Sequence, residues 1–422
     1  MALAARRGGD KRVSPAPADV VIVGAGPAGS AAALFLAERG HAVVVLDRAQ
    51  FPRPKLCGEY LSPETARILD RLGVLKAVDE AGAVPLRGMK ITAPDGTLLE
   101  ADYPTAGPWR GYRDHALALP RMIFDQVLLE RVKACPIHVR ERHRVTDLLT
   151  DGDRVVGVAG IDAGGIAFET PARLVIAADG RHSVVARRLG LVRPHRLRRV
   201  ALLMYAEGID GFDGRGEIYL DPPDYAILNP VAPGKVNLSL VVPLAHAAPH
   251  RGKLERFFHA RLKQLDHLQP RLGEMRPLGP VLALGPLAYR VAQPRCGGVL
   301  LVGDAAGFFD PFTGEGLYTA LRSAEMAAQV ADAALAKGDC SASELARFWR
   351  ARHAAFKDKE RFTRLLQVVV GRRWLANLVA HRLARRPDLL GLLMGVVGDF
   401  VSPRMLLSPR CLFGRRQLTA TA

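Results

Sequence analysis

The sequence predicts an α/β fold in which a dinucleotide-binding domain is interleaved with a strand-rich second domain and followed by a helical C-terminal region. A glycine-rich turn lies between two apolar runs within residues 20–47, which is typical of a βαβ unit that holds a dinucleotide. A later apolar run ends in Gly303-Asp304, ahead of a long helical pattern. Alternating or apolar stretches at 200–206 and 235–242 predict strands outside this domain.

The first element is a short buried strand, Val20 to Val23, followed by glycines with the spacing G-x-G-x-x-G. The first glycine permits a tight turn, the second lets the backbone approach a pyrophosphate, and the third lets helix and strand pack closely. A helix over 28–38 directs its N-terminus at the phosphates. A second strand over 41–46 ends in an aspartate that is expected to accept the ribose hydroxyls. The residues of this unit expected to bind the nucleotide are Gly24, Gly26, Pro27, Ala28, Gly29, Asp47 and Arg48.

Length and composition narrow the class of protein. The chain has 422 residues, room for about two domains and an appendage, and its hydrophobic content of 49% suits a globular protein. Its five cysteines lack CxxC spacing, which argues against structural zinc and favours a reduced, cytoplasmic setting. Residues 1–17 are interpreted as a flexible leader and not as a signal peptide. No apolar stretch approaches the ~20 residues that a membrane span needs.

The net charge of +17 has two interpretations. It fits a coding bias with solvated basic faces, and it also fits attraction to lipid headgroups, an acidic carrier protein or a phosphorylated substrate. No nucleic-acid-binding motif is found, so nucleic acid is not an expected partner. Residues 361–422 hold eleven arginines, no lysine and two acids, interleaved with apolar stretches. This tail is expected either to pack as a helical cap or to lie at a membrane surface.

Three later motifs, taken in order with the opening glycines, resemble a known superfamily. A helical pattern with Leu-Pro-Arg occupies 119–132, a strand followed by Asp-Gly lies within 174–190, and residues 300–321 are LLVGDAAGFFDPFTGEGLYTAL. They resemble the FAD-dependent aromatic hydroxylases, geranylgeranyl reductases and flavin halogenases, over about residues 1–350. The resemblance implies a Rossmann-like FAD-binding domain of the glutathione-reductase type, with an interleaved β-sheet substrate domain. The domain limits it implies are 18–82, 119–190 and 292–350 for FAD binding, 83–118 and 191–291 for the substrate, and 351–422 for the basic helical region.

The same resemblance assigns further residues to the flavin. Asp304 is expected to hydrogen-bond the ribityl chain, and the helix N-terminus that follows favours negative charge at the pyrimidine side of the ring. Arg121 is expected to contact the phosphates or the ribose, and Val145 the adenine through its backbone. The other residues implied at the cofactor are Asp179 and Gly180 near the pyrophosphate, and Gly303, Pro311, Gly314, Glu315 and Gly316 near the ring.

The loop at 53–64, RPKLCGEYLSPE, indicates the subfamily. It resembles a loop of the geranylgeranyl reductase branch that places Cys57 and Gly58 beside the flavin. Glu59 and Tyr60 follow as candidates for handling a proton. Gly307 also favours this branch, because aromatic hydroxylases commonly have His there. The chain is therefore expected to be closest to the geranylgeranyl-reductase-like members.

A second segment argues against prenyl reduction. Reductases carry a P-x-x-Y-x-W-x-F-P pattern, which Pro222, Tyr225 and Pro230 match, whereas Ile227 and Asn229 replace both later aromatics. A long prenyl chain would be expected to pack along such aromatics. The tyrosine is still expected to face the pocket. The W-x-W-x-I-P segment of halogenases is not found.

These features predict an FAD-dependent oxidoreductase whose flavin carries the redox chemistry. We expect an NAD(P)H-dependent monooxygenase acting on a lipophilic or carrier-tethered substrate. The alternatives are an ene-reductase of prenyl or polyene chains and a non-redox, cyclase-like FAD enzyme. No second G-x-G-x-x-G is present, so NAD(P)H is expected to bind only transiently. The candidate catalytic residues are Cys57, Glu59, Tyr60 and Tyr225; metal ligands are not expected, and the oligomeric state stays open.

Overall fold

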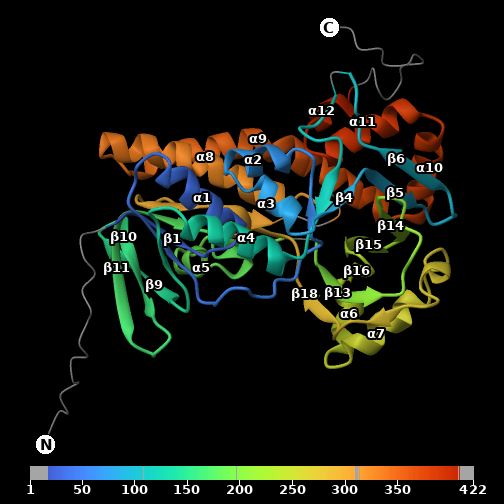
Figure 1. Cartoon of the computed structure of the whole chain (residues 1–422), viewed down its shortest axis with the longest axis horizontal. Helices are drawn as coiled ribbons and strands as arrows, with labels where there is room; N and C mark the ends of the chain where they lie inside the picture. The colour runs from blue at the N-terminus through green and yellow to red at the C-terminus, as the bar shows by residue number, and fades with distance from the viewer. Residues whose placement is uncertain are drawn as a thin grey trace, which may run out of the picture.

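The computed structural model describes residues 18–107, 109–195, 197–308, 312, 314–406 and 408. It has the predicted mixed α/β architecture, with a sheet towards each end of the molecule and long helices that join the two ends (Figure 1). The leader predicted at 1–17 and the candidate residue Pro311 lie outside the described residues.

In the described residues, one sheet has seven strands and contains the opening βαβ unit. Its parallel part has the order β8, β2, β1, β11, β20, and the long strand β11 continues into an antiparallel ribbon with β10 and β9. The second strand begins at Val43, two residues later than expected. The bounds are β1 (Ala18–Val23), β2 (Val43–Leu46), β8 (His138–Arg140), β9 (Arg144–Asp151), β10 (Arg154–Ile161), β11 (Ala167–Ala177) and β20 (Val299–Leu301).

The parallel strands are buried on both faces, which explains their nearly continuous apolar sequences. Alternate side chains of β1 enter different cores. Val20 and Ile22 pack with α1, α4 and α8, whereas Val21 and Val23 lie in the core that includes β10 and α5. The helix bounds are α1 (Pro27–Ala37), α4 (Arg121–Lys133), α5 (Val184–Arg188) and α8 (Gly316–Lys337).

The other large sheet has eight strands among the described residues and is antiparallel except where β14 pairs with β5. The strands predicted at 200–206 and 235–242 are its neighbours β13 and β16. One face packs against α7, and the other faces the seven-stranded sheet and the C-terminal helices. The bounds are β5 (Gly88–Thr92), β6 (Leu98–Asp102), β13 (Arg199–Glu207), β14 (Arg215–Asp221), β15 (Asp224–Ala232), β16 (Lys235–Pro243), β17 (Arg276–Pro277), β18 (Leu282–Leu284), α6 (Leu244–Ala247) and α7 (Leu254–Leu262).

Smaller elements connect the two halves. In one three-stranded sheet, β7 pairs with both β3 and β4. In another, β19 pairs with both β12 and β21. The domain limits given above stay predictions. The bounds are β3 (Tyr60–Leu61), α2 (Thr65–Arg71), α3 (Leu75–Glu80), β4 (Val84–Leu86), β7 (Ala116–Ala118), β12 (Val192–Pro194), β19 (Tyr289–Val291) and β21 (Gly307–Phe308).

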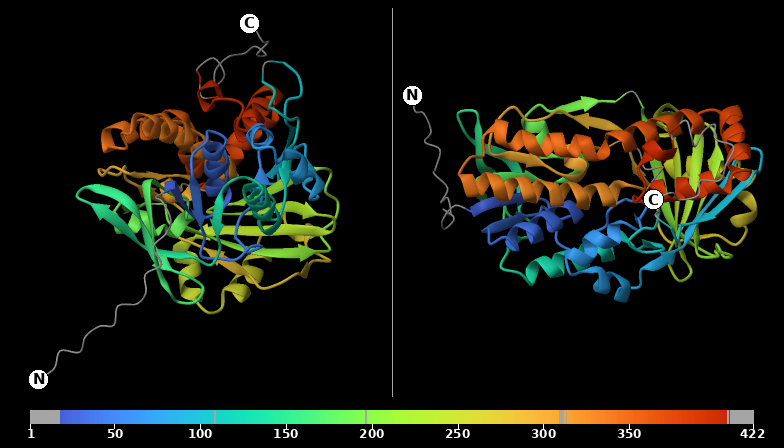
Figure 2. Two further views of the ribbon diagram at one scale, coloured as in Figure 1. Left: turned by 60° about the vertical axis from the view of Figure 1, so that its left-hand side comes forward. Right: turned by 90° about the horizontal axis from the view of Figure 1, so that it is seen from above.

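The C-terminal region is helical, as predicted. The helix α9 (Ala342–Val370) runs beside α8 and ends near the shorter C-terminal helices (Figure 2). It is followed by α10 (Arg373–Ala384), α11 (Pro387–Val397) and α12 (Pro403–Leu406). Apolar side chains of α9, α10 and α11 form a core with β5 and β6 at the edge of the eight-stranded sheet. These helices therefore close the end of the molecule remote from the opening βαβ unit.

Candidate active site

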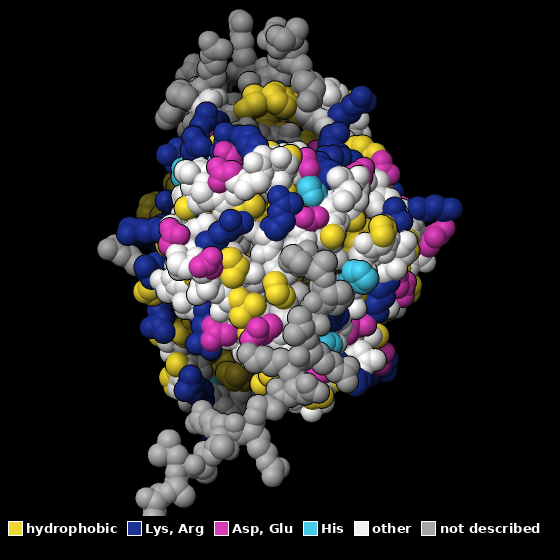
Figure 3. Space-filling model, turned by 90° about the vertical axis from the view of Figure 1, so that its left-hand side faces the viewer, with side chains coloured by type: hydrophobic (Ala, Val, Ile, Leu, Met, Phe, Trp, Pro, Cys, Tyr) yellow, Lys and Arg dark blue, Asp and Glu magenta, His cyan; other side chains and the backbone are white. Residues whose placement is uncertain are grey.

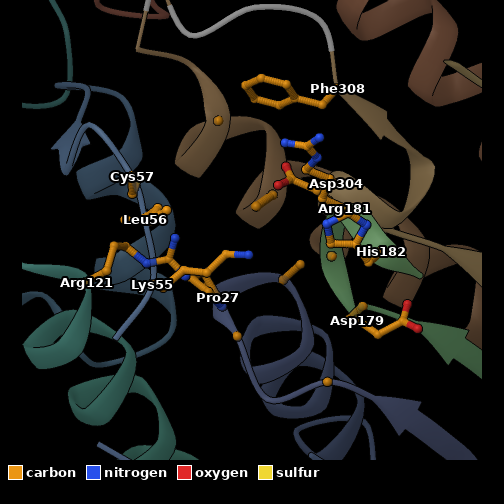
Figure 4. Close-up of a pocket in the computed structure, with 18 of the residues that line it drawn as sticks. Pro27, Lys55, Leu56, Cys57, Arg121, Asp179, Arg181, His182, Asp304 and Phe308 are labelled. Carbon is orange, nitrogen blue, oxygen red and sulfur yellow. The ribbon is translucent and has the colours of Figure 1, made fainter. Parts of the chain in front are cut away.

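A cavity of about 1030 Å³, here called the main cavity, lies at the carboxyl ends of β1, β2, β11 and β20, where open parallel sheets bind ligands. Side chains of β13, β15 and β16 close its other side. Figure 4 shows Lys55, Cys57 and Arg121 facing Arg181 and Asp304 across it. The predicted site residues that line it are Gly24, Gly26, Pro27, Ala28, Asp47, Arg48, Cys57, Gly58, Glu59, Tyr60, Arg121, Val145, Asp179, Gly180, Gly303, Asp304, Gly314 and Gly316.

The three opening glycines are required for three different reasons. Gly24 has φ +103°, and a Cβ there would lie 2.5 Å from the carbonyl oxygen of Ala178. A Cβ on Gly29, which does not line the cavity, would lie 1.8 Å from the carbonyl oxygen of Gly24. A Cβ on Gly26 would meet only the end of the Arg53 side chain, at 3.4 Å. Gly24 and Gly29 therefore serve the fold, whereas Gly26 leaves free space at the N-terminus of α1, where a phosphate binds well.

Asp47 and Val145 occupy positions at the rim of this nucleotide-binding turn. The Asp47 carboxylate accepts hydrogen bonds from the backbone N–H groups of Ala25 and Ala49, both at 2.8 Å. It thus fixes the glycine turn, and its contact with a ribose stays a prediction. Val145 lies in β9, one strand later than the strand that directly follows α4.

The turn after β11 brings cations to the cavity. Gly180 has φ +75°, and the Asp179 carboxylate accepts from the N–H of Val184 at 2.7 Å. The Nη1 of Arg181 is buried without a hydrogen-bond partner among the described residues. Burial and the neighbouring cations, Arg181 among them, lower the pKa of His182. A buried guanidinium nitrogen without an acceptor indicates a site for an anionic ligand.

Asp304 lies opposite a second group of cations. Burial raises the pKa of its carboxyl, while Lys55, Arg121 and Arg181 act in the opposite direction. Burial lowers the pKa of the Lys55 ammonium, whereas the nearby Asp304 carboxylate acts to raise it. Arg121 itself is held by the carboxylate of Asp125 through two hydrogen bonds of 2.6 and 2.8 Å. The contact of Arg121 with the FAD phosphates or ribose stays a prediction. The structure adds that the Asp125 carboxylate already orients the Arg121 guanidinium.

The N-terminus of α8 meets the cavity through glycines. Gly314 has φ +70°, and a Cβ there would lie 2.6 Å from the ring of Tyr60. Gly316 lines the cavity, whereas Glu315 does not. The Glu315 carboxylate lies 3.6 Å from the Nζ of Lys359 in α9. A buried lysine thus attracts the Glu315 carboxylate, and the approach of Glu315 to the ring stays a prediction.

The loop Cys57 to Tyr60 presents the candidate catalytic groups. Burial raises the pKa of the Cys57 thiol, so it stays protonated. Glu59 is buried at φ +59°; its carboxylate accepts from the Arg121 N–H at 2.8 Å and also from the Tyr205 hydroxyl. Burial raises its pKa, against these hydrogen bonds. The hydroxyls of Tyr60 and Tyr103 are 2.5 Å apart, and burial raises the pKa of Tyr60 well above its usual range.

A family model described as FAD binding domain matches residues 17–363. The chain belongs to this family. Digeranylgeranylglycerophospholipid reductase 2 of Methanopyrus kandleri is 33% identical over 339 residues, which cover 78% of this chain and 81% of the relative. This flavoprotein is thus an FAD-dependent oxidoreductase of the geranylgeranyl-reductase-like branch. The expected superfamily, cofactor and enzyme class are confirmed.

Solved structures share the fold of the flavoprotein. The flavin-dependent brominase Bmp2 superposes with a TM-score of 0.81 at 19% identity, over 93% of this chain and 98% of that one. A geranylgeranyl bacteriochlorophyll reductase-like protein from Thermoplasma acidophilum superposes with a TM-score of 0.70 at 23% identity, over 94% of each chain. These similarities extend over both large sheets, so the fold alone does not separate halogenation from reduction.

The main cavity of the flavoprotein fits FAD. Its pyrophosphate can lie against Gly26 and the first turn of α1, where free space meets the positive end of a helix. The unpartnered Arg181 nitrogen and the Lys55 ammonium supply cations for an anionic ligand. Asp304 and the glycines before α8 lie farther along the same cavity, on the side expected for the ribityl chain and the ring.

Two buried asparagines, which the sequence analysis did not identify as site residues, hold the loop Cys57 to Tyr60. Asn229 donates to the Gly58 carbonyl at 2.8 Å, and Asn237 donates to the Cys57 carbonyl at 2.9 Å. Asn237 also donates to the Glu59 carboxylate at 3.0 Å. The sequence did contain a signal for these contacts: each asparagine lies within an apolar strand pattern. A buried amide needs hydrogen-bond partners, so such a residue indicates a polar contact inside the protein.

We expect an Asn237→Ala variant to lose about 1–3 kcal/mol of unfolding free energy, because Glu59 and the Cys57 carbonyl would lose a buried donor. Turnover should fall while FAD stays bound. Urea unfolding and the flavin absorbance of the purified protein check both points. Asn377→Ala is the matched control, since the Asn377 Oδ1 has no partner among the described residues. Equal stability and turnover of the two variants would remove the anchoring role of Asn237.

Tyr225 does not face the pocket, contrary to expectation. Its side chain is fully buried, packs edge-on against Phe312 with ring centroids 5.0 Å apart, and lines no cavity described here. Ile227, two residues further along β15, lines the cavity instead. The strand thus presents an aliphatic side chain to the site, and Tyr225 loses its place among the candidate catalytic residues.

A second cavity of about 120 Å³, here called the apolar cavity, adjoins the first. Gly58, Tyr60, Ile227 and Gly314 line both, so the two spaces meet beside the loop Cys57 to Tyr60. From there the apolar cavity extends between the eight-stranded sheet and the C-terminal helices. Its further lining is almost wholly aliphatic and includes Met89, Ile91, Ile218, Leu220, Leu366, Val369, Val379, Ala380, Leu393 and Val397.

Proposed function

We propose that this flavoprotein reduces carbon–carbon double bonds of a prenyl chain carried on a lipid, with NAD(P)H as a transient electron donor. The observation that carries the proposal is the apolar cavity, which joins the main cavity at Tyr60 and Ile227. An elongated hydrocarbon could lie there with one double bond beside the flavin. The relatedness to a digeranylgeranylglycerophospholipid reductase supports this substrate class. Alkene reduction therefore replaces oxygenation as our first choice.

Reduction of an alkene needs a hydride at one carbon and a proton at the other, and bound reduced FAD supplies the hydride. Among the candidate groups, Tyr60 alone lines both cavities. Its raised pKa keeps the hydroxyl protonated, and Tyr103 orients the hydroxyl. We assign the proton to the Tyr60 Oη, which takes up a proton from solvent before the next turnover. The Glu59 carboxylate is occupied by Tyr205, Asn237 and the Arg121 N–H, so it positions the loop.

Anaerobic turnover of a geranylgeranyl ether lipid with a chemical reductant tests the function. We expect products that are two hydrogen atoms heavier for each double bond reduced, and no oxygen incorporated from isotopically labelled gas in an aerobic run. Replacing Ile227 by Trp should lower turnover about 10-fold or more with FAD retained, because the bulky ring would obstruct the junction of the cavities. Ile227→Val is the control. A product that gains oxygen from the gas and forms only aerobically would restore the monooxygenase.

A further inference from the structure

The helices α9 and α10 are apolar on two opposite sides. Their inner sides line the apolar cavity through Leu366, Val369, Val370, Ala376, Val379 and Ala380. Their outer sides expose Leu365 and Val368 at 45% each, Trp374 at 66% and Leu378 at 57%. A helix that serves only as a cap would place polar residues outside. A single helix thickness thus separates exposed apolar side chains from the space proposed for the substrate.

The exposed apolar residues are gathered in one place. Of the twelve large hydrophobic side chains exposed in the described residues, four lie within 365–378. By contrast, the opposite end of the molecule, which bears β10 and β11, mixes basic, acidic and scattered hydrophobic side chains (Figure 3). Such clustering marks an interaction surface, whereas single exposed hydrophobics do not.

Arginines surround this cluster. Residues 361–386 contain seven arginines and no aspartate or glutamate. Several of them form ion pairs: Asp221 pairs with Arg373, Glu360 with Arg364 at 3.5 Å, Asp358 with Arg361 at 3.6 Å, and Asp388 with Arg386 at 2.7 Å. We call the four exposed apolar residues together with Arg361, Arg364, Arg372, Arg373, Arg382 and Arg385 the hairpin face.

We propose that the hairpin face docks on an anionic phospholipid bilayer, so that the lipid chain passes from the membrane into the apolar cavity beside α10. An exposed tryptophan and leucine on helices that also carry exposed arginines match the interface between acyl chains and negative headgroups. In the described residues, no helix is both long and apolar enough to cross a bilayer. The passage of a lipid chain into the cavity rests on the proposed function. Binding of the hairpin face to a bilayer can be tested without it.

Sedimentation of the full-length holoenzyme with vesicles tests the proposal without turnover. We expect about 10-fold or greater preference for phosphatidylglycerol–phosphatidylcholine vesicles over phosphatidylcholine alone, and weakening in high salt. Trp374→Ser with Leu378→Ser should lower vesicle binding about 10-fold or more. The matched control, Ile166→Ser with Val192→Ser, also removes two exposed apolar side chains, at 46% and 42% exposure, and should bind as the parent does.

A second readout separates docking from catalysis. Turnover of substrate dispersed in detergent should be the same for the parent and the Trp374→Ser, Leu378→Ser variant, because neither residue lines a cavity described here. Equal vesicle binding by this variant and the parent would overturn the proposal. So would salt-insensitive binding, or an acidic protein surface that binds where anionic vesicles do not. If the reductase assay fails while vesicle binding holds, only the proposed function falls.

Discussion

A Gly26→Val variant is expected to fold and to lose FAD. Gly26 has an extended backbone, with φ −72° and ψ −177°, that any residue adopts. A Cβ there would meet only the flexible end of Arg53, at 3.4 Å. We expect the pyrophosphate of FAD to occupy that space in the holoenzyme, so a branched side chain would displace it. We expect FAD to bind about 100-fold or more weakly, measured by titration of the flavin-free protein.

Gly29→Ala serves as the contrasting variant. Its Cβ would lie 1.8 Å from the Gly24 carbonyl oxygen, so the helix would have to move away from the strand. We expect this variant to lose stability, whereas Gly26→Val should keep the unfolding midpoint of the flavin-free parent. A Gly26→Val protein that is purified with its full flavin content would contradict the assignment of the pyrophosphate to this turn.

Local signals in the sequence predicted the nucleotide-binding half well. The spacing of Gly24, Gly26 and Gly29 after a buried strand depends only on neighbouring residues, and so does the start of α8 at Gly316. Apolar runs also marked β13 and β16 to within one residue at each end. Such features are predictable because strand, turn and helix preferences act over a few positions.

The contacts that hold the loop Cys57 to Tyr60 could not be predicted in the same way. It is held by Asn229 and Asn237, which are more than 170 positions from Gly58 and Cys57, and no short-range pattern links them. Glu315 was assigned to the ring, but Lys359 of α9 attracts its carboxylate. These contacts depend on how distant segments pack, which periodicity does not encode.

The loss of aromatics in β15 is weaker evidence against a prenyl substrate than the sequence suggested. Ile227 and Asn229 suggested that a prenyl channel had been abandoned. In the structure, the Asn229 amide bonds the Gly58 carbonyl, while Ile227 lines an aliphatic cavity that also receives Leu366 and Val379. Aliphatic side chains bury a hydrocarbon as well as aromatic ones do, so the lost aromatic pattern does not argue against a prenyl substrate.

An Asp399→Asn variant is expected to lose much of its stability. Lys359 is buried in α9, where its Nζ donates to the Val396 carbonyl at 2.9 Å and pairs with Asp399. Asp399 has φ +70°, which asparagine tolerates, so the substitution removes charge with little backbone strain. Breaking a buried ion pair costs about 3–5 kcal/mol, because the remaining charge stays buried. Glu315, 3.6 Å from Lys359, should keep the loss at the lower end of this range.

A double variant separates lost charge from lost packing. Lys359→Met with Asp399→Asn leaves no unpaired buried lysine, so it should regain at least about 1 kcal/mol relative to Asp399→Asn alone. Urea unfolding of the parent, the two single variants and the double variant, each with saturating FAD, gives the coupling free energy between Lys359 and Asp399. If Asp399→Asn matches the parent in stability, or if the two substitutions are additive, the pair does not hold α9 to the turn after α11. That result would also remove Lys359 as the reason why Glu315 turns away from the main cavity.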